Sequence, residues 1–401
     1  MKSYLLIGGL LISSALNAET LHLQPAAQGD LQVHRLVASK AAKVGSVDRA
    51  PAQFVWALDT AVELQRPEPY LADSREFWAE VDSKALAGGY RFHTTAPGAL
   101  IRVSVASPAG KASGELPALE LEHAGRLLSE GEGFSAVADR QALKAAGVEF
   151  ATDTKVFKLS DKVGAGEFVL RAPKAGGSLL VHVNEPQSDL HLQLQTEADT
   201  AGAGDRLQVR AKLLEGTQAK SATRIGGLLT APDGASYTVE FKADGDGYLA
   251  TVRLPKAAMA GPELWELHGF VAASDGAEAL YLRDAKTSFA VSAASARLSG
   301  TVEKGKGRGI QLRFDVQAAS AGRYELRGTL YGTRAGELVP FAQAHSAAWL
   351  DAGNGQLALD IDKSMLSKAG VQAPFEIRGL ELNDQSRLAK IEQRAVGLRI
   401  E

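Results

Sequence analysis

The chain has no cysteine among its 401 residues. This absence excludes disulfide bonds and a cysteine nucleophile, and it also excludes the thiol to which a lipoprotein lipid is attached. The stability of the fold must therefore come from buried apolar surface. A chain of this length can supply several hydrophobic cores, one for each of several domains.

Aromatic residues are scarce, at 6% of the sequence, and no long run of lysine or arginine occurs. Basic residues total 44 and acidic residues 47, which gives a formal net charge of −3. Surfaces for nucleic acid or for anionic membranes need concentrated positive charge, so we expect no nucleic-acid partner. Apolar residues recur with a period of two in most segments, which predicts a folded, strand-rich protein.

The longest apolar run lies in the amino-terminal stretch MKSYLLIGGLLISSALNAET. Lys2 precedes the apolar residues Leu5 to Ile12, and small residues lead to Ala15 and Ala18. The run is shorter than the roughly 20 residues that a spanning helix needs. We therefore predict a signal peptide over residues 1–18, with cleavage after Ala18 favoured and an uncleaved anchor as the alternative. The predicted protein is exported, periplasmic or extracellular, without a stable membrane anchor.

Residues 19–188 are predicted to form a mixed, mostly β N-terminal domain. Alternating apolar residues predict early strands over 31–37 and 52–58, and further strands follow along the domain. The clearest helix is expected near 135–147, with Ser135 as its N-cap.

The second half of the sequence contains an internal repeat. Three blocks recur in the same order, namely 204–213 with 322–330, 247–250 with 355–358, and 264–270 with 374–380. Ordered recurrence of this kind predicts one fold used twice.

Each copy has short alternating strands with turns at intervals of about 8 to 12 residues, the pattern of a β-sandwich. The copies are predicted over residues 189–292 and 293–401, with Trp265 and Phe375 filling equivalent core positions. The predicted fold class is therefore mainly β, with the mixed N-terminal domain followed by two tandem immunoglobulin-like β-sandwiches.

The stretch FKADGDGYLATV contains a candidate calcium site at Asp244 and Asp246. If Asp244 began a helix-loop-helix calcium loop, the twelfth position would be Pro255, where a glutamate is required. Alternating residues flank the two aspartates, and Asp-Gly is a favoured hairpin turn because it tolerates positive φ. We predict a hairpin turn, with an exposed calcium site of another geometry as the alternative.

The densest cluster of possible metal ligands consists of His182, Glu185, Asp189 and His191. Their spacing matches no known zinc motif, although two imidazoles and two carboxylates are suitable ligands. Both histidines alternate with apolar neighbours on either side of a proline-containing turn. We therefore predict surface residues at a domain junction and no bound cofactor, and keep a zinc site as the alternative.

Several catalytic and nucleotide-binding motifs are missing. The sequence has no G-x-S-x-G elbow and no G-x-x-x-x-G-K-[ST] phosphate loop. The four tryptophans are predicted to be core anchors rather than a ligand platform. They are Trp56, Trp78, Trp265 and Trp349.

Three segments carry a resemblance to a known family. Trp78, the stretch TTAPGALIRV at 94–103 and the stretch EPQSDLHL at 185–192, followed by two sandwich repeats, resemble domain-of-unknown-function family 4785 of secreted bacterial proteins. The resemblance covers most of the chain after residue 18. It implies export and the order N-terminal domain, immunoglobulin-like domain, second sandwich. It implies no activity and no catalytic residues.

The favoured function is a non-enzymatic binding or interaction protein whose partner is a protein or a glycan. Loops at sandwich ends or domain junctions are the expected contact sites, because a rigid sandwich holds such loops in place. Two alternatives remain open. One is a metal-assisted hydrolase that uses the His182 to His191 cluster, and the other is a structural spacer without a large exposed apolar patch.

Overall fold

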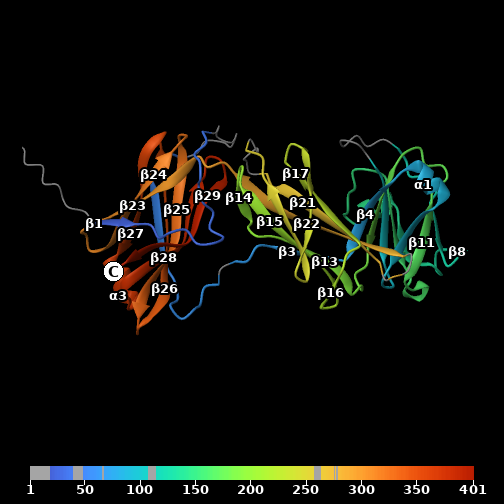
Figure 1. Cartoon of the computed structure of the whole chain (residues 1–401), viewed down its shortest axis with the longest axis horizontal. Coiled ribbons are helices and arrows are strands. Elements are labelled where there is room, and N and C mark those ends of the chain that lie inside the picture. The colour runs from blue at the N-terminus through green and yellow to red at the C-terminus, as the bar shows by residue number, and fades with distance from the viewer. Residues whose placement is uncertain are drawn as a thin grey trace, which may run out of the picture. The chain divides into compact units, whose positions relative to one another are not determined.

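The computed structural model describes residues 19–38, 48–65, 67–106, 114–256, 263–274, 276 and 279–401. The predicted signal peptide at residues 1–18 lies outside this part of the chain. The described chain is mainly β, as predicted, and divides into two compact units (Figure 1). We call Pro67–Val291 the middle unit, and we call Ser292–Glu401 together with the described residues of Met1–Arg66 the composite unit.

The N-terminal half of the middle unit is a sandwich of two antiparallel sheets. One sheet has the strand order Glu76–Val81 (β4), Leu179–Asn184 (β12), Leu100–Val105 (β6), Thr154–Leu159 (β10) and Phe134–Ala138 (β9). The other has the order Tyr90–Thr94 (β5), Gly166–Arg171 (β11), Glu120–His123 (β7) and Arg126–Leu127 (β8). Buried residues alternate along β12, as the pleat of a half-buried strand requires. Phe77 and Val181 of the first sheet pack with Phe92 and Phe168 of the second.

The helix predicted near 135–147 is shorter and begins later than expected. Residue Ser135 lies in β9, which pairs with β10, and the helix α2 spans only Arg140–Ala145. Asp139 is the actual N-cap, because its carboxylate accepts a hydrogen bond from Ala142 N at 2.9 Å. The burial of Phe134 in the sheet outweighs the local capping signal of Ser135. A second helix, Ser83–Gly88 (α1), lies between β4 and β5.

The C-terminal half of the middle unit is a second sandwich. One sheet has the order Lys242–Asp244 (β19), Gly247–Arg253 (β20), Arg206–Glu215 (β15), Leu190–Thr196 (β13) and Leu71–Ser74 (β3), and Gln218–Lys220 (β16) also pairs with β15. The other has the order Ser236–Val239 (β18), Arg224–Thr230 (β17), Trp265–Ser274 (β21) and Leu280–Ser292 (β22), and Thr200–Gly202 (β14) pairs with β22. Strand β22 also meets β4 at Asp284 and Glu76, so one sheet continues from the first sandwich into the second.

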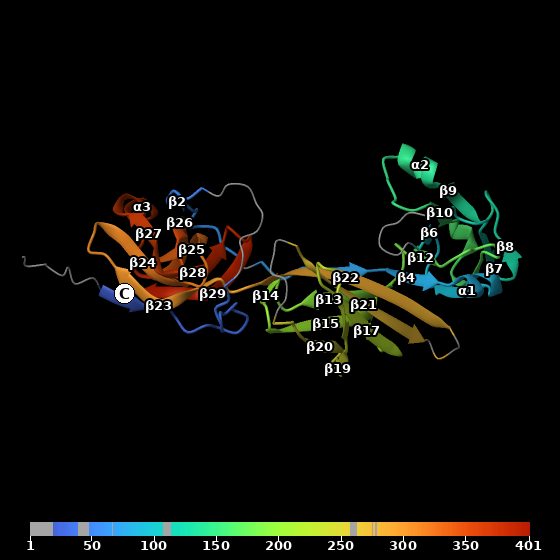
Figure 2. The ribbon, with the colours of Figure 1, turned by 90° about the horizontal axis from the view of Figure 1, so that it is seen from above.

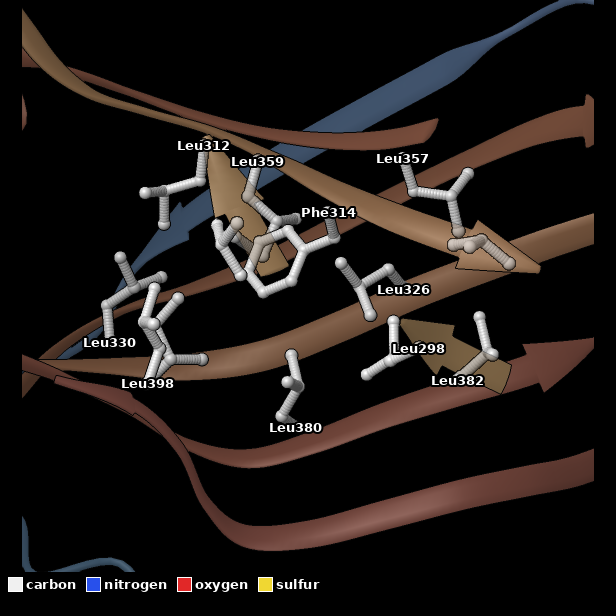
Figure 3. Close-up of a cluster of buried hydrophobic side chains, with 14 of the residues drawn as sticks. Leu298, Leu312, Phe314, Leu326, Leu330, Leu357, Leu359, Leu380, Leu382 and Leu398 are labelled. Atoms are coloured by element: carbon white, nitrogen blue, oxygen red, sulfur yellow. The ribbon is translucent and has the colours of Figure 1, made fainter. Parts of the chain in front are cut away.

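The composite unit is a third sandwich. One sheet contains Ala296–Lys304 (β23), Gly309–Ala318 (β24) and Gly353–Asp362 (β27), and the other contains Glu337–Leu350 (β26), Gly322–Arg334 (β25), Gln372–Asp384 (β28) and Ala389–Ile400 (β29). Leucines of both sheets, among them Leu312 and Leu326, surround the buried ring of Phe314 (Figure 3). The helix Lys363–Ala369 (α3) connects β27 to β28.

The N-terminal segment completes the composite unit, which differs from the prediction that residues 19–188 form one domain. Strand Glu19–His22 (β1) pairs with β23, and strand Ala52–Ala57 (β2) pairs with β26 (Figures 1 and 2). Each adds an edge strand to one of the two sheets, and Leu21 and Val55 pack against the core. The predicted strand over 31–37 is reduced to one bridge between Leu31 and Gln393. Exposed sheet edges need partners, and this segment supplies them.

The two sandwiches of the predicted repeat have the same strand order. The order β20-β15-β13 corresponds to β27-β24-β23, and β18-β17-β21-β22 corresponds to β26-β25-β28-β29. Two of the three predicted sequence blocks lie on equivalent strands, β20 with β27 and β21 with β28. Trp265 and Phe375 lie near the starts of β21 and β28, the first fully buried and the second partly buried.

The third sequence block is assigned wrongly. Segment 204–213 covers β15, whereas 322–330 lies in β25, which belongs to the opposite sheet of its sandwich. The equivalent of β15 is β24, where Ile310-Gln-Leu-Arg313 follows the pattern of Leu207-Gln-Val-Arg210. Both β15 and β25 are long alternating strands, so periodicity alone does not distinguish them.

Candidate functional site

The candidate metal ligand His182 lies in β12 and is engaged by a neighbouring strand. Its Nε2 atom lies 2.7 Å from Oε2 of Glu76 in β4, and its ring stacks on Trp78 with centroids 4.6 Å apart. Lys286 lies over the same indole, at 5.5 Å from its centroid. Trp78 is therefore covered by polar neighbours and is neither a fully buried anchor nor an open platform.

His191 and Asp189 point to different surroundings. The side chain of His191 is only 7% exposed, and its Nδ1 atom lies 3.3 Å from Nη2 of Arg75. Asp189 is exposed, as predicted for a junction residue. The prediction of a surface position is wrong for His191 and also for Glu185, because β13 and the junction bury both.

Glu185 belongs to a buried ion pair with Arg283 of β22. Its Oε1 atom lies 2.8 Å from Nη1 of Arg283, a contact that does not have the geometry of a hydrogen bond. Its Oε2 atom accepts hydrogen bonds from the backbone of Ala96 at 3.0 Å and from the Thr95 hydroxyl at 2.9 Å. Nη2 of Arg283 donates to the hydroxyls of Thr95 and Ser188. Burial lowers the pKa of the Arg283 guanidinium, and the adjacent carboxylate opposes that shift.

These contacts separate the four predicted metal ligands. His182 pairs with Glu76, His191 contacts Arg75, and Glu185 pairs with Arg283. Within the described ranges of the chain, no group of three or more histidine, aspartate or glutamate side chains is arranged to hold a metal ion. Each of these three side chains is engaged by a residue outside the cluster, and the pair of Glu185 with Arg283 joins the two sandwiches of the middle unit.

The predicted hairpin turn at the two aspartates is confirmed. Asp244 of β19 pairs with Gly247 of β20, and Gly245 between them has a φ of +59°. Arg210 binds the Asp244 carboxylate at 3.1 Å, and Lys212 binds Asp246 at 2.8 Å. The hydrogen bond from Lys212 lowers the pKa of Asp246. Both candidate calcium ligands therefore face lysine or arginine.

A polar hollow of about 280 Å³ lies on the outer face of β5, β7 and β11. Its charges are matched internally, because Arg91 pairs with Glu167 and Arg171 pairs with Glu122. Such mutual pairing is typical of a solvated strand face.

Exposed aromatic side chains lie on β2 of the composite unit, where core residues were expected. Trp56 is 50% exposed and Phe54 is 59% exposed, whereas Val55 between them packs against the core. The two rings stack with centroids 6.0 Å apart, and His345 meets the Trp56 ring edge-on at 4.9 Å. The prediction that Trp56 is a core anchor is therefore wrong. Trp265, at 1% exposed, is a core anchor as predicted.

Polar side chains continue this surface onto the next two strands. In the register of the sheet, Gln343 lies opposite Trp56 and His345 opposite Phe54, and both have neighbours on β25, Thr329 and Arg327. Residues directly opposite in a sheet point to the same side, so these six side chains share one face, which we call the aromatic-polar face. The imidazole Nδ1 of His345 lies 2.9 Å from Oε1 of Glu325, which fixes the orientation of the ring.

The aromatic-polar face was missed although its signal is present in the sequence. Phe54 and Trp56 alternate with Gln53 and Val55, so the aromatic pair was correctly expected on one side of a strand. Alternation does not say which side faces the core. Pairing of β2 with β26 decides which side faces the core, because it places Val55 against the core and leaves Phe54 and Trp56 on the other side.

Together these features define a mainly β protein of sandwich domains with a candidate ligand surface on an edge strand. Family models match two parts of the chain, the N-terminal domain of DUF4785, a domain of unknown function, at residues 43–185 and its C-terminal domain at residues 295–400. The chain belongs to the DUF4785 family. A comparison with curated proteins finds no match.

A crystal structure of a DUF4785 family protein from Legionella pneumophila has a similar fold. Its TM-score is 0.72 at 19% sequence identity, over 92% of this chain and 99% of that chain. Alpha-2-macroglobulins are much less similar. The native Escherichia coli protein gives a TM-score of 0.30 at 13% identity, over 77% of this chain and 20% of that chain. The methylamine-reacted Salmonella protein gives a TM-score of 0.27 at 15% identity, over 83% of this chain and 21% of that chain.

No helix in the described residues has the length and apolar character needed to cross a membrane.

Proposed function

We propose that this protein is an exported, non-enzymatic binding protein that holds a glycan on the aromatic-polar face of the composite unit. The observation that carries the proposal is the stacked, half-exposed pair of Phe54 and Trp56 on an edge strand. Two large aromatic rings kept in water lose the free energy that their burial would give. An exposed apolar patch rimmed by polar groups is typical of an interaction site.

The chemistry of the face suits a sugar ring. A pyranose presents C–H groups on its faces and hydroxyl groups around its rim, so it requires an apolar contact beside hydrogen-bonding groups. The Trp56 ring supplies the apolar contact. Gln343, Thr329 and Arg327 supply amide, hydroxyl and guanidinium groups on the adjoining strands. The site therefore differs from the loop ends that the sequence favoured.

The signal peptide predicted from the sequence supports the exported part of the proposal. Cell-surface polysaccharides are abundant outside the cytoplasm, so an exported chain would meet them.

The test compares glycan binding by the whole chain after residue 18 with that of the Trp56→Ala variant. The probes are a glycan array and soluble peptidoglycan fragments, with affinity measured by calorimetry. Loss of one stacking ring at the centre of a small site is expected to weaken binding by about tenfold or more. Tyr70→Ala, which removes an exposed aromatic ring from the middle unit, should leave affinity unchanged.

Two outcomes would overturn the proposal. One is the absence of any glycan ligand for the folded protein, and the other is a bound glycan whose affinity is equal in the Trp56→Ala and parent chains. Capture of a protein partner that depends on Trp56 would replace the glycan by a protein as the ligand of this face.

A further inference from the structure

The composite unit contains a cavity of about 430 Å³ in addition to the aromatic-polar face. Its walls come from three distant parts of the sequence, which are the end of β2 with the segment after it, strands β25 and β26, and helix α3 with the following Gly370. Leu58 is held to β26 by a hydrogen bond from its backbone N–H to the Phe341 carbonyl at 2.9 Å. Ligand pockets in proteins commonly have volumes of about 300 to 1,000 Å³, so this cavity is large enough for a small molecule.

One part of the cavity lining is apolar. Met365 of α3 lies in this lining and is only partly buried against the hydrophobic core, whereas the Phe341 side chain is fully buried and offers no surface to a ligand. Leu58 and Ala369 add further aliphatic surface. A ligand with an apolar body would remove this surface from water, which favours binding.

The other part of the lining carries two cations, Arg334 and Lys368, and one carboxylate, that of Asp59, so positive charge is in excess. Arg334 donates a hydrogen bond to the Thr60 hydroxyl, and Lys368 extends from α3. Within the described part of the chain, neither cation has a carboxylate within ion-pair distance, and the Asp59 carboxylate instead accepts a hydrogen bond from the Ala61 backbone at 2.9 Å. By contrast, Arg327 on the outer face of the same unit pairs with Glu381.

We propose that this cavity binds a small amphipathic anion, with its carboxylate or phosphate group on Arg334 and Lys368 and its apolar body against Met365, Leu58 and Ala369. The two cations bind the anionic end of such a molecule, and the apolar wall beside them contacts its apolar end. Arginine also offers paired donors that match the oxygens of either anionic group. The proposal is independent of glycan binding, because it uses none of the six residues of the aromatic-polar face.

The test uses three eight-carbon probes that differ only in their head group. Octanoate supplies a carboxylate, octyl phosphate supplies a phosphate, and octanol is neutral. Titration calorimetry with the whole chain should show at least one anion binding about tenfold or more tighter than octanol. The stronger of the two anions distinguishes a carboxylate from a phosphate ligand.

Charge-removing variants locate the site. Arg334→Gln combined with Lys368→Gln should weaken binding of the preferred anion by about tenfold or more, because both charged contacts are lost. Lys363→Gln is the matched control, since Lys363 is also an exposed lysine of α3 but does not line the cavity. Ala369→Phe should block the apolar part and abolish binding of all three probes.

The charge-removing substitutions change exposed side chains, so those variants should fold. Melting followed by circular dichroism verifies that they do. Equal affinity for octanol and both anions would overturn the proposal, as would undiminished anion binding in the double variant. Absence of binding of either anion to the folded parent chain at millimolar concentration would overturn it as well.

Discussion

The Glu185 carboxylate and the Arg283 guanidinium lie 2.8 Å apart, and both side chains are fully buried. Glu185 follows β12 of the first sandwich, and Arg283 lies in β22 of the second. The hydroxyls of Thr95 and Ser188 and the Leu190 carbonyl accept hydrogen bonds from the guanidinium. This ion pair therefore ties together the two halves of the middle unit.

Removing one member of that pair should strongly destabilise the middle unit. Glu185→Gln leaves a buried guanidinium without its counter-charge, which costs about 3 to 5 kcal/mol in comparable sites. Urea unfolding of the whole chain measures the change. The control Lys220→Gln breaks an exposed pair with Glu215 and should cost less than about 1 kcal/mol. Equal losses of unfolding free energy in the two variants would mean that the buried pair contributes no more to stability than an exposed pair.

The N-terminal segment should be required for the stability of the composite unit. Leu21 of β1 packs against its core, so Leu21→Asp places a charge against apolar surface and should cost about 2 to 3 kcal/mol. Thr20→Lys, an exposed change in the same strand, should alter stability by less than about 0.5 kcal/mol. The measurement is urea unfolding followed by tryptophan fluorescence. A composite unit that unfolds identically in both variants would show that β1 is dispensable.

The stability of the middle unit should fall in strongly alkaline solution because of Tyr90. Burial, reinforced by the charge of Asp284, raises the pKa of the Tyr90 hydroxyl to about 12. The unfolded chain loses this proton near its ordinary pKa of about 10, before the folded chain does. The contribution is therefore complete below pH 10 or so and declines toward pH 12, by up to about 1.4 kcal/mol per pH unit.

The variant Tyr90→Phe tests this pH dependence. It should flatten the decline of the unfolding free energy across the alkaline range, and Tyr70→Phe, which removes an exposed hydroxyl, should not. An unchanged slope in Tyr90→Phe would contradict the assignment.

The hairpin at Gly245 should be sensitive to the backbone conformation of that residue. Gly245 has a φ of +59° in open surroundings, so Gly245→Ala should cost roughly 1 kcal/mol through backbone strain alone. Gly88→Ala, at an equally open position without positive φ, should be neutral or slightly stabilising. Thermal melting measures both changes. A destabilising Gly88→Ala together with a neutral Gly245→Ala would refute the argument.

Metal ions should leave the melting temperature unchanged. His182 is engaged by Glu76, and Asp246 by Lys212, so binding of zinc or calcium would first have to break these pairs. Melting with zinc, with calcium and with EDTA checks the expectation. A stabilisation by zinc that disappears in the variant His182→Gln with His191→Gln would instead revive the metal-assisted hydrolase.

The alternation of apolar residues correctly predicted sandwiches in the second half, because a half-buried strand leaves a period of two in the sequence. It did not identify the inward side of β2, where Val55 packs against the core and Trp56 does not. Local signals also misplaced the start of α2, because Ser135 resembles an N-cap but lies in β9, which pairs with β10. The junction pair of Glu185 and Arg283 had no sequence signal, since its members lie in separate sandwiches.

The sequence alone determined that this protein is a disulfide-free, mainly β chain of the DUF4785 type in which one sandwich is used twice. These properties follow from composition, from short-range periodicity and from recurring segments, all of which are local. Only the tertiary structure decided that β1 and β2 complete the last sandwich, that Glu185 is buried against Arg283, and that Arg334 and Lys368 share a cavity. These are pairings between distant segments. They depend on which sheet edges remain open once the whole chain has packed, and no local pattern records that competition.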